Sequence, residues 1–166
     1  IGMGAKALIV CEPAANIVYL SPRQIQRSPQ LMERFVLEPN RTLKALLDRH
    51  GVDLIFHDCG ELTTEMVRQF AAELRPVMMS LGSSRKLWED AAVVPKDTVL
   101  YGNLPTKTFY SDAVMPAEEV RRRTADLVAQ MHACGHPHIC GSECDVLHVP
   151  DAAAAIRRKV EVMLEA

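Results

Sequence analysis

The sequence contains no long hydrophobic run and no strong excess of charge of either sign. No apolar stretch approaches the roughly 20 residues that a membrane-spanning helix needs. The formal net charge of the 166 residues is −2, which gives no electrostatic footprint for nucleic acid or an anionic membrane. With 48% hydrophobic and 24% charged residues, the composition is that of an ordinary globular protein of about one domain.

The cysteines and the first residues lack the features of a secreted protein. The five cysteines are odd in number and scattered through a chain too long for a small disulfide scaffold. The opening "IGMGAKALIVCEP" has neither the charged leader nor the small-residue cleavage site of a secretory signal. We therefore expect a reducing, cytoplasmic location.

Short apolar runs alternate with longer amphipathic ones along the whole chain. The short runs are rich in Val, Ile, Leu or Met and stop at Gly or a small polar residue, which predicts buried strands. These strands are expected over residues 6–12, 52–60, 76–83, 97–103 and 136–143. Helices are expected over residues 30–50, with an interruption at Pro39, and over 63–74, 115–135 and 150–166.

Strands that alternate with helices and are apolar throughout predict an α/β fold with a parallel sheet covered by helices. We count about five βα units in a single domain over residues 1–166 and see no linker. An eight-unit (β/α)₈ barrel takes about 250 residues, and 200 at the low end. The chain is therefore long enough for a doubly wound sheet or for the larger part of a barrel, and composition alone does not choose between them.

In both architectures the chemistry lies at the carboxyl ends of the strands. The second predicted strand ends in His57 and Cys59, which point to the same face because alternate residues do, while Asp58 points to the other. Imidazole and thiolate are both good zinc ligands. Cys144 is best placed to supply a third ligand, and Glu12, at the end of the first strand, a fourth through oxygen. Three protein ligands with a weak or open fourth position are typical of a catalytic zinc site.

Other interpretations of these residues remain open. His57 and Cys59 also fit an inert buried pair, and Cys140 with Cys144 fits a redox couple. Cys11 and Cys134 are expected to be small core residues. We expect His132, His136 and His138 at a helix end or on the surface, and Arg121–Arg123 on a solvated helix face.

Four segments, taken in order, resemble the uroporphyrinogen decarboxylase superfamily. They are "EPAANIVYLSPRQ", "FHDCGE", "YGNLPT" and "GSECDVLHVP", and the similarity covers nearly the whole chain. It corresponds to the C-terminal part of the family's TIM (β/α)₈ barrel, from about the fourth strand onward, so the N-terminal βα units are expected to be absent. "GNLPT" lacks the aspartate of the family's Gly-Asn-Leu-Asp-Pro element.

Within the superfamily, "HDCG" resembles the His-x-Cys of the zinc-dependent methyltransferase branch. The resemblance implies zinc held by His57, Cys59 and Cys144. It also implies methyl transfer between a corrinoid carried on a partner protein and a thiol or pterin acceptor. Asp58 and Asn103 are the candidate catalytic residues, as contacts to the ligands or the substrate.

Two other functions are compatible with the same residues. One is a metal-free decarboxylase acting on a carboxylated substrate, for which Arg23 and Arg85 are the only basic residues near the strand ends. The other is a non-catalytic barrel remnant. Because a barrel that lacks strands has open edges, we further expect a homo-oligomer or an association with the missing barrel half, and little activity from this fragment alone.

Overall fold

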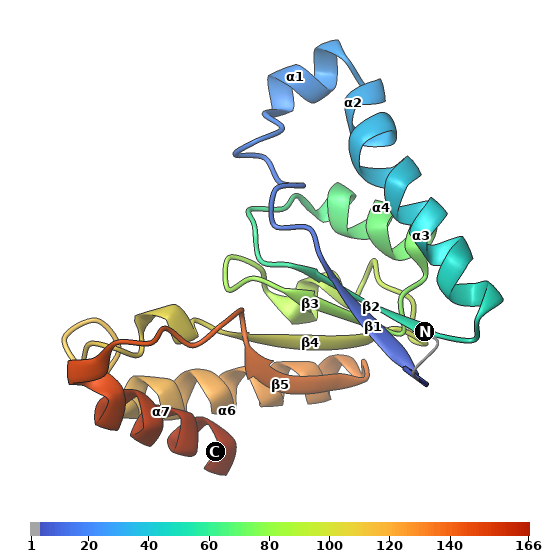
Figure 1. The fold of residues 1–166 in the computed structure, drawn as a ribbon. Coiled ribbons are helices and arrows are strands. Elements are labelled where there is room, and N and C mark those ends of the chain that lie inside the picture. Colours follow the sequence, from blue (N-terminus) through green and yellow to red (C-terminus); the bar gives the residue numbers. More distant parts are fainter. Residues whose placement is uncertain (1–3) are drawn as a thin grey trace.

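The computed structural model describes residues 4–166 and contains one sheet of five parallel strands (Figure 1). All five predicted strands are present, with ends that differ from the prediction by one or two residues. The strands are β1 (Ala7–Cys11), β2 (Asp53–Asp58), β3 (Met78–Leu81), β4 (Val99–Leu104) and β5 (His138–Ser142).

The strand order decides between the two architectures that composition left open. Neighbours in the sheet follow the chain order, β1-β2-β3-β4-β5, and every pair is parallel. A doubly wound sheet reverses its strand order at a switch point, whereas a barrel adds each strand next to the previous one. The sheet is therefore that of a partial TIM-type barrel, as the sequence predicts.

The helices are α1 (Pro22–Arg27), α2 (Gln30–Met32), α3 (Glu38–Arg49), α4 (Thr64–Leu74), α5 (Leu87–Asp90), α6 (Ala117–Cys134) and α7 (Ala153–Glu165). The later helices cover the outer face of the sheet, whereas α1 and α2 stand away from it (Figure 1). Helix α3 contacts β2, α5 contacts β4, and α6 contacts β4 and β5, while α7 packs on α6. Phe56, in the centre of β2, is fully buried against Phe70 of α4, with ring centroids 5.1 Å apart. No helix within residues 4–166 is both long and apolar enough to cross a membrane.

Local sequence explains where several helices begin and end. Ser21 and Gln24 form a reciprocal capping box at the start of α1, with Pro22 in the first turn. The Thr63 side chain accepts a hydrogen bond from the Met66 N–H at the start of α4. Helix α6 ends at Gly135, whose φ of 60° is a conformation that glycine adopts without strain.

The predicted break at Pro39 is wrong. The chain stays helical from α2 through a π-helical turn (Glu33–Leu37) into α3, and Pro39 lies in the first turn of α3. Proline lacks an amide hydrogen and crowds the carbonyl four residues earlier, and the wider π turn lies where that crowding occurs.

The apolar side chains of the last two long helices, α6 and α7, are only partly buried. In α6, Val120, Leu127 and Met131 are buried, but Val128 is 37% exposed. In α7, Ile156 is buried, whereas Leu164 near the chain's end is 75% exposed.

Three further expectations concern cysteines and histidines. Cys11 and Cys134 are exposed, so their assignment to the core is wrong. His136 is buried and its Nε2 lies 2.9 Å from the Thr98 carbonyl oxygen, so it is not a surface residue. Cys11 is exposed because β1 is an edge strand whose inner face is not covered by further strands.

Candidate metal centre

The site is built on the inner, helix-free face of the sheet at the end of β2. The parallel register places His57 between Cys11 of β1 and Ser80 of β3, with all three on the same face. A cavity of about 500 Å³ opens over this face. Its lining is Ile9, Cys11, Pro13, Ile55, His57, Cys59, Met78, Ser80, Tyr101, Ser142, Cys144 and Asp145.

His57, Cys59 and Cys144 come together in this cavity. One ligand atom of each residue lies within 4.8 Å of those of the other two. His57 is buried and the two cysteines are half-buried free thiols. Cys144 follows β5 in the chain, so the fold brings together residues that are 85 positions apart. We call this group the His57–Cys59–Cys144 cluster.

The spacing of the two sulfur atoms fits tetrahedral zinc. Zn–S bonds of about 2.3 Å at a tetrahedral angle place two sulfurs about 3.8 Å apart. The Cys59 and Cys144 Sγ atoms are 3.6 Å apart. A disulfide would need about 2.0 Å, so the pair is not bonded. Two thiols and an imidazole around one point are also the donor set that zinc prefers over harder cations.

Ser80 orients the imidazole of His57. The Ser80 Oγ lies 2.8 Å from His57 Nδ1 in a buried contact. That contact occupies Nδ1 and leaves Nε2 as the nitrogen available to a metal. Burial lowers the pKa of His57, an effect that the charge of Asp145 opposes and that of Lys107 reinforces. The ring is therefore held in the neutral form that ligates metals.

The Cys59 thiol is poorly ionised without a cation nearby. Burial, together with the hydrogen bond and charge of Cys144, raises the pKa of Cys59 to about 11. Lys107 opposes this shift, and its Nζ lies 3.9 Å from Cys59 Sγ. A metal ion between the sulfurs would reverse the balance, because a coordinating thiol is deprotonated outright.

Two glycines allow the loops around the cluster to approach one another. A Cβ on Gly82, just after β3, would lie 2.6 Å from the Cys59 carbonyl oxygen. A Cβ on Gly60 would lie 2.4 Å from the side chain of the buried Asn16. The loop after β1, which carries Asn16, also pairs with the HDCG loop through the Ile17 N–H and the Glu61 carbonyl, 2.9 Å apart.

The other predicted site residues lie outside the cluster. Glu12 donates its backbone N–H to the His57 carbonyl at 2.8 Å, but its carboxylate is not among the three grouped ligands. Asp58 is fully buried away from the cavity lining, and its Oδ1 accepts the Gly60 N–H at 2.8 Å. Burial raises the pKa of Asp58 to about 7, against the opposing effect of the Gly60 hydrogen bond.

Asn103 lies in β4 and makes hydrogen bonds to a neighbouring loop. Its Nδ2 donates to the Gly82 carbonyl at 2.7 Å and to the Arg85 carbonyl at 2.8 Å. It therefore ties β4 to the loop after β3, the same loop that packs on Cys59. Any effect of Asn103 on the cluster is indirect.

Sequence reasoning missed Ser80 and Lys107. The position of Ser80 could have been predicted, because the alternation of side chains in neighbouring parallel strands places Ser80 and His57 on the same face of the sheet. Lys107 had no such signal: it lies in a 3₁₀ turn (Thr106–Thr108) whose direction depends on the preceding Pro105.

Comparison with known proteins assigns the chain to a family. The sequence model of the uroporphyrinogen decarboxylase (URO-D) family matches residues 1–162. No curated protein sequence matches the chain. The family match extends over nearly the whole length and includes every strand of the sheet and all three cluster residues. The chain therefore belongs to the uroporphyrinogen decarboxylase family.

Proposed function

We propose that the protein is a zinc-dependent methyltransferase of this family, which moves a methyl group between a corrinoid protein and a thiol or pterin acceptor. The observation that carries the proposal is the His57–Cys59–Cys144 cluster, with its 3.6 Å separation between sulfurs. Three soft and borderline protein ligands facing a cavity leave room for a fourth ligand from a substrate.

The chain's own residues have distinct parts in this proposal. His57, Cys59 and Cys144 hold the ion, and Ser80 fixes the imidazole through Nδ1. When bound, zinc supplies a Lewis acid that favours an acceptor thiol in its ionised, nucleophilic form. The thiol proton passes to solvent through the open cavity. The acceptor sulfur would then bond to the methyl carbon, while the bond between that carbon and the corrinoid cobalt would break and leave its electron pair on the cobalt.

Association is part of the proposal because both edges of the sheet are open. The outer strands β1 and β5 carry exposed apolar side chains: Leu8 is 41% exposed, Ile9 57% and Ile139 46%. Unpaired strand edges of this kind favour pairing with another chain. A second copy, or further strands that complete the barrel, would cover the inner face and the cavity.

The rival activity is a metal-free decarboxylation, which the description of the matching family favours. That activity requires basic residues that grip substrate carboxylates. Arg85 is occupied elsewhere: its guanidinium pairs with the buried Asp90 and donates to the Leu62 carbonyl at 2.9 Å. Arg23 lies on the exposed helix α1, away from the cavity lining.

Methyl transfer from methylcobalamin to 2-mercaptoethanol, followed by the change in corrinoid absorption, tests the proposal. We expect zinc-dependent transfer by the wild type, at a low rate because the barrel is incomplete. Transfer should be lost in Cys59→Ala and retained in Cys140→Ala, whose half-buried thiol lies outside the cluster. Equal transfer by all three proteins would reject the proposed role of the cluster. Release of CO₂ from a carboxylated porphyrinogen without metal would favour the decarboxylase, and neither activity would favour a non-catalytic remnant.

A further inference from the structure

Lys107 is a cation placed beside the cluster without a carboxylate partner. It is half-buried, and its Nζ lies 3.9 Å from Cys59 Sγ. The ion pairs found within residues 4–166 do not include it. Because removing an ammonium from water costs free energy unless an anion compensates, this position calls for negative charge nearby.

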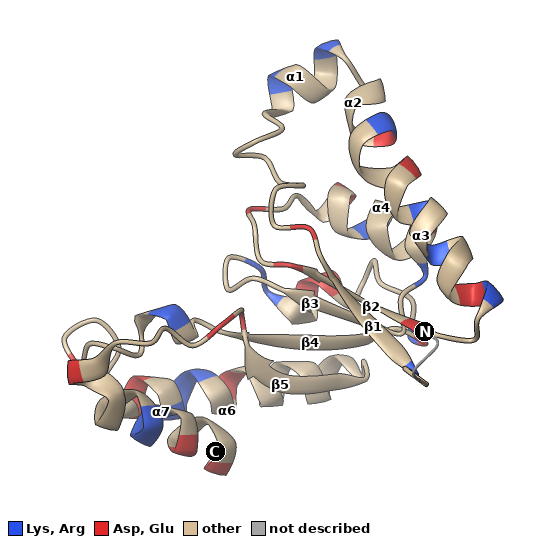
Figure 2. Cartoon of the chain, viewed as in Figure 1, with Lys and Arg blue, Asp and Glu red and all other residues tan. Residues whose placement is uncertain are grey.

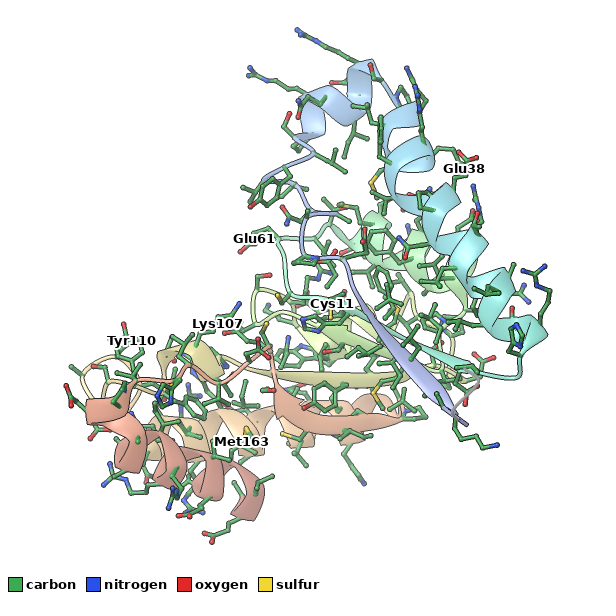
Figure 3. All side chains as sticks on the ribbon, viewed as in Figure 1. Cys11, Glu38, Glu61, Lys107, Tyr110 and Met163 are labelled. Carbon is green, nitrogen blue, oxygen red and sulfur yellow. The ribbon has the colours of Figure 1, made fainter. Side chains whose placement is uncertain are left out.

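Several acidic residues lie at the end of the sheet where Lys107 is found. Figure 2 shows most Lys and Arg residues on the helices, whereas acidic residues mark the segments after β1, β2 and β5. Figure 3 shows Lys107 at the same end of the sheet as Glu61, where the strands terminate. Lys107 thus lies among several carboxylates, and the loop after β3 adds the basic Arg85 and Lys86 at this end of the sheet.

The backbone that carries Lys107 is anchored on both sides. Before it, the buried Thr106 donates its hydroxyl to the carbonyl of Asp145, the residue after Cys144, at 3.5 Å. After it, the Phe109 carbonyl accepts a hydrogen bond from the fully buried Lys159 of α7 at 2.8 Å. The 3₁₀ turn is therefore tied to the same segment as the third cluster residue.

The charges at the proposed zinc site indicate which negative charge the Lys107 ammonium would compensate. A dication with the thiolates of Cys59 and Cys144 and a neutral His57 sums to zero, and the acidic Asp145 also lines the cavity. An acceptor bound as a thiolate adds one negative charge, whereas a neutral ligand adds none. The charge of Lys107 would therefore favour an ionised acceptor and leave neutral ligands unaffected.

We propose that Lys107 is a specificity-determining residue that favours anionic, thiolate acceptors over neutral ligands at the open position of the site. This inference rests on the proposed function. An opposite charge within about 4–6 Å favours an ionised group by one to three pKa units, a factor of about 10 to 1000. Because Lys107 is only half-buried and partly screened by solvent, we expect the lower end, about tenfold.

The test uses the full chain loaded with cobalt(II), whose visible absorption reports changes in the ligands. The protein is titrated with 2-mercaptoethanol, which binds as a thiolate, and with imidazole, which binds neutral. In Lys107→Met we expect the dissociation constant for 2-mercaptoethanol to rise about tenfold, with that for imidazole unchanged. Lys107→Arg should restore thiol binding. Lys86→Met removes an exposed lysine that pairs with Glu89 and should leave both titrations unchanged.

The outcomes separate this inference from the proposed function. Loss of both ligands in Lys107→Met would indicate a structural role and overturn the inference, as would thiol binding equal to that of the wild type. Failure of the wild type to take up zinc or cobalt would instead reject the metal site itself, and the inference with it.

Discussion

Replacement of Ser80 with alanine tests whether the cluster is a pre-organised metal site. The Ser80 hydroxyl makes a buried contact of 2.8 Å with His57 Nδ1, and its loss frees the imidazole to rotate or change tautomer. Loss of a partner that orients a metal-ligating histidine typically costs 10- to 100-fold in metal affinity. That range corresponds to about 1.4–2.7 kcal/mol. The lost hydrogen bond itself contributes only about 0.5–1.5 kcal/mol to folding, so the metal-free protein should stay folded.

The assay is competition for zinc between the protein and a chromophoric chelator. Ser83→Ala is a matched control, because the Ser83 hydroxyl lies in the next loop and donates to Glu143 instead of a cluster residue. We expect weaker zinc binding in Ser80→Ala and wild-type binding in Ser83→Ala. Wild-type affinity in Ser80→Ala would refute the idea that this hydroxyl orients the ligand, and equal losses in both variants would point to a general loosening of the loop.

Two further predictions concern the residues next to the cluster. Gly82→Ala places a Cβ 2.6 Å from the Cys59 carbonyl oxygen. Urea denaturation should therefore show that the free energy of unfolding falls by about 1–3 kcal/mol, and zinc binding should weaken. An unchanged free energy of unfolding would contradict this prediction, because it would mean that the loop moves aside at no cost. The pKa of Asp58 is raised to about 7, so the folded protein holds the Asp58 proton more tightly than the unfolded chain does. The stabilisation that results is fully present at low pH. It declines as the pH rises from about 4 to about 7, and the free energy of unfolding falls by at most about 4 kcal/mol. Asp58→Asn should remove that decline in denaturation curves taken across this range, and an identical pH slope in both proteins would contradict the assignment.

The periodicity of the strands was enough to predict most of the fold and the placement of His57 and Cys59 in the site. The apolar runs and their ends predict five parallel strands, and the alternation of side chains predicts that His57 and Cys59 share a face that Asp58 does not. Local rules of this kind hold because side-chain direction in a strand follows from position alone.

Features set by loops and by the edges of the sheet were harder to predict. The place of Lys107 depends on the turn after Pro105, and the contacts of Asn103 depend on the path of the loop after β3. Cys11 was expected in the core because it falls inside a strand, but β1 is an edge strand with an open inner face. The predicted helix break at Pro39 was wrong because the preceding π turn accommodates a proline that would break a regular α-helix.

The most direct test of the account is the zinc content of the purified protein, measured by elemental analysis for the wild type, Cys59→Ala and Cys134→Ala. Cys134 is an exposed thiol on α6 outside the cluster and serves as the control. The account predicts about one zinc per chain in the wild type and in Cys134→Ala, and none in Cys59→Ala. No zinc in the wild type, or zinc retained in Cys59→Ala, would contradict it.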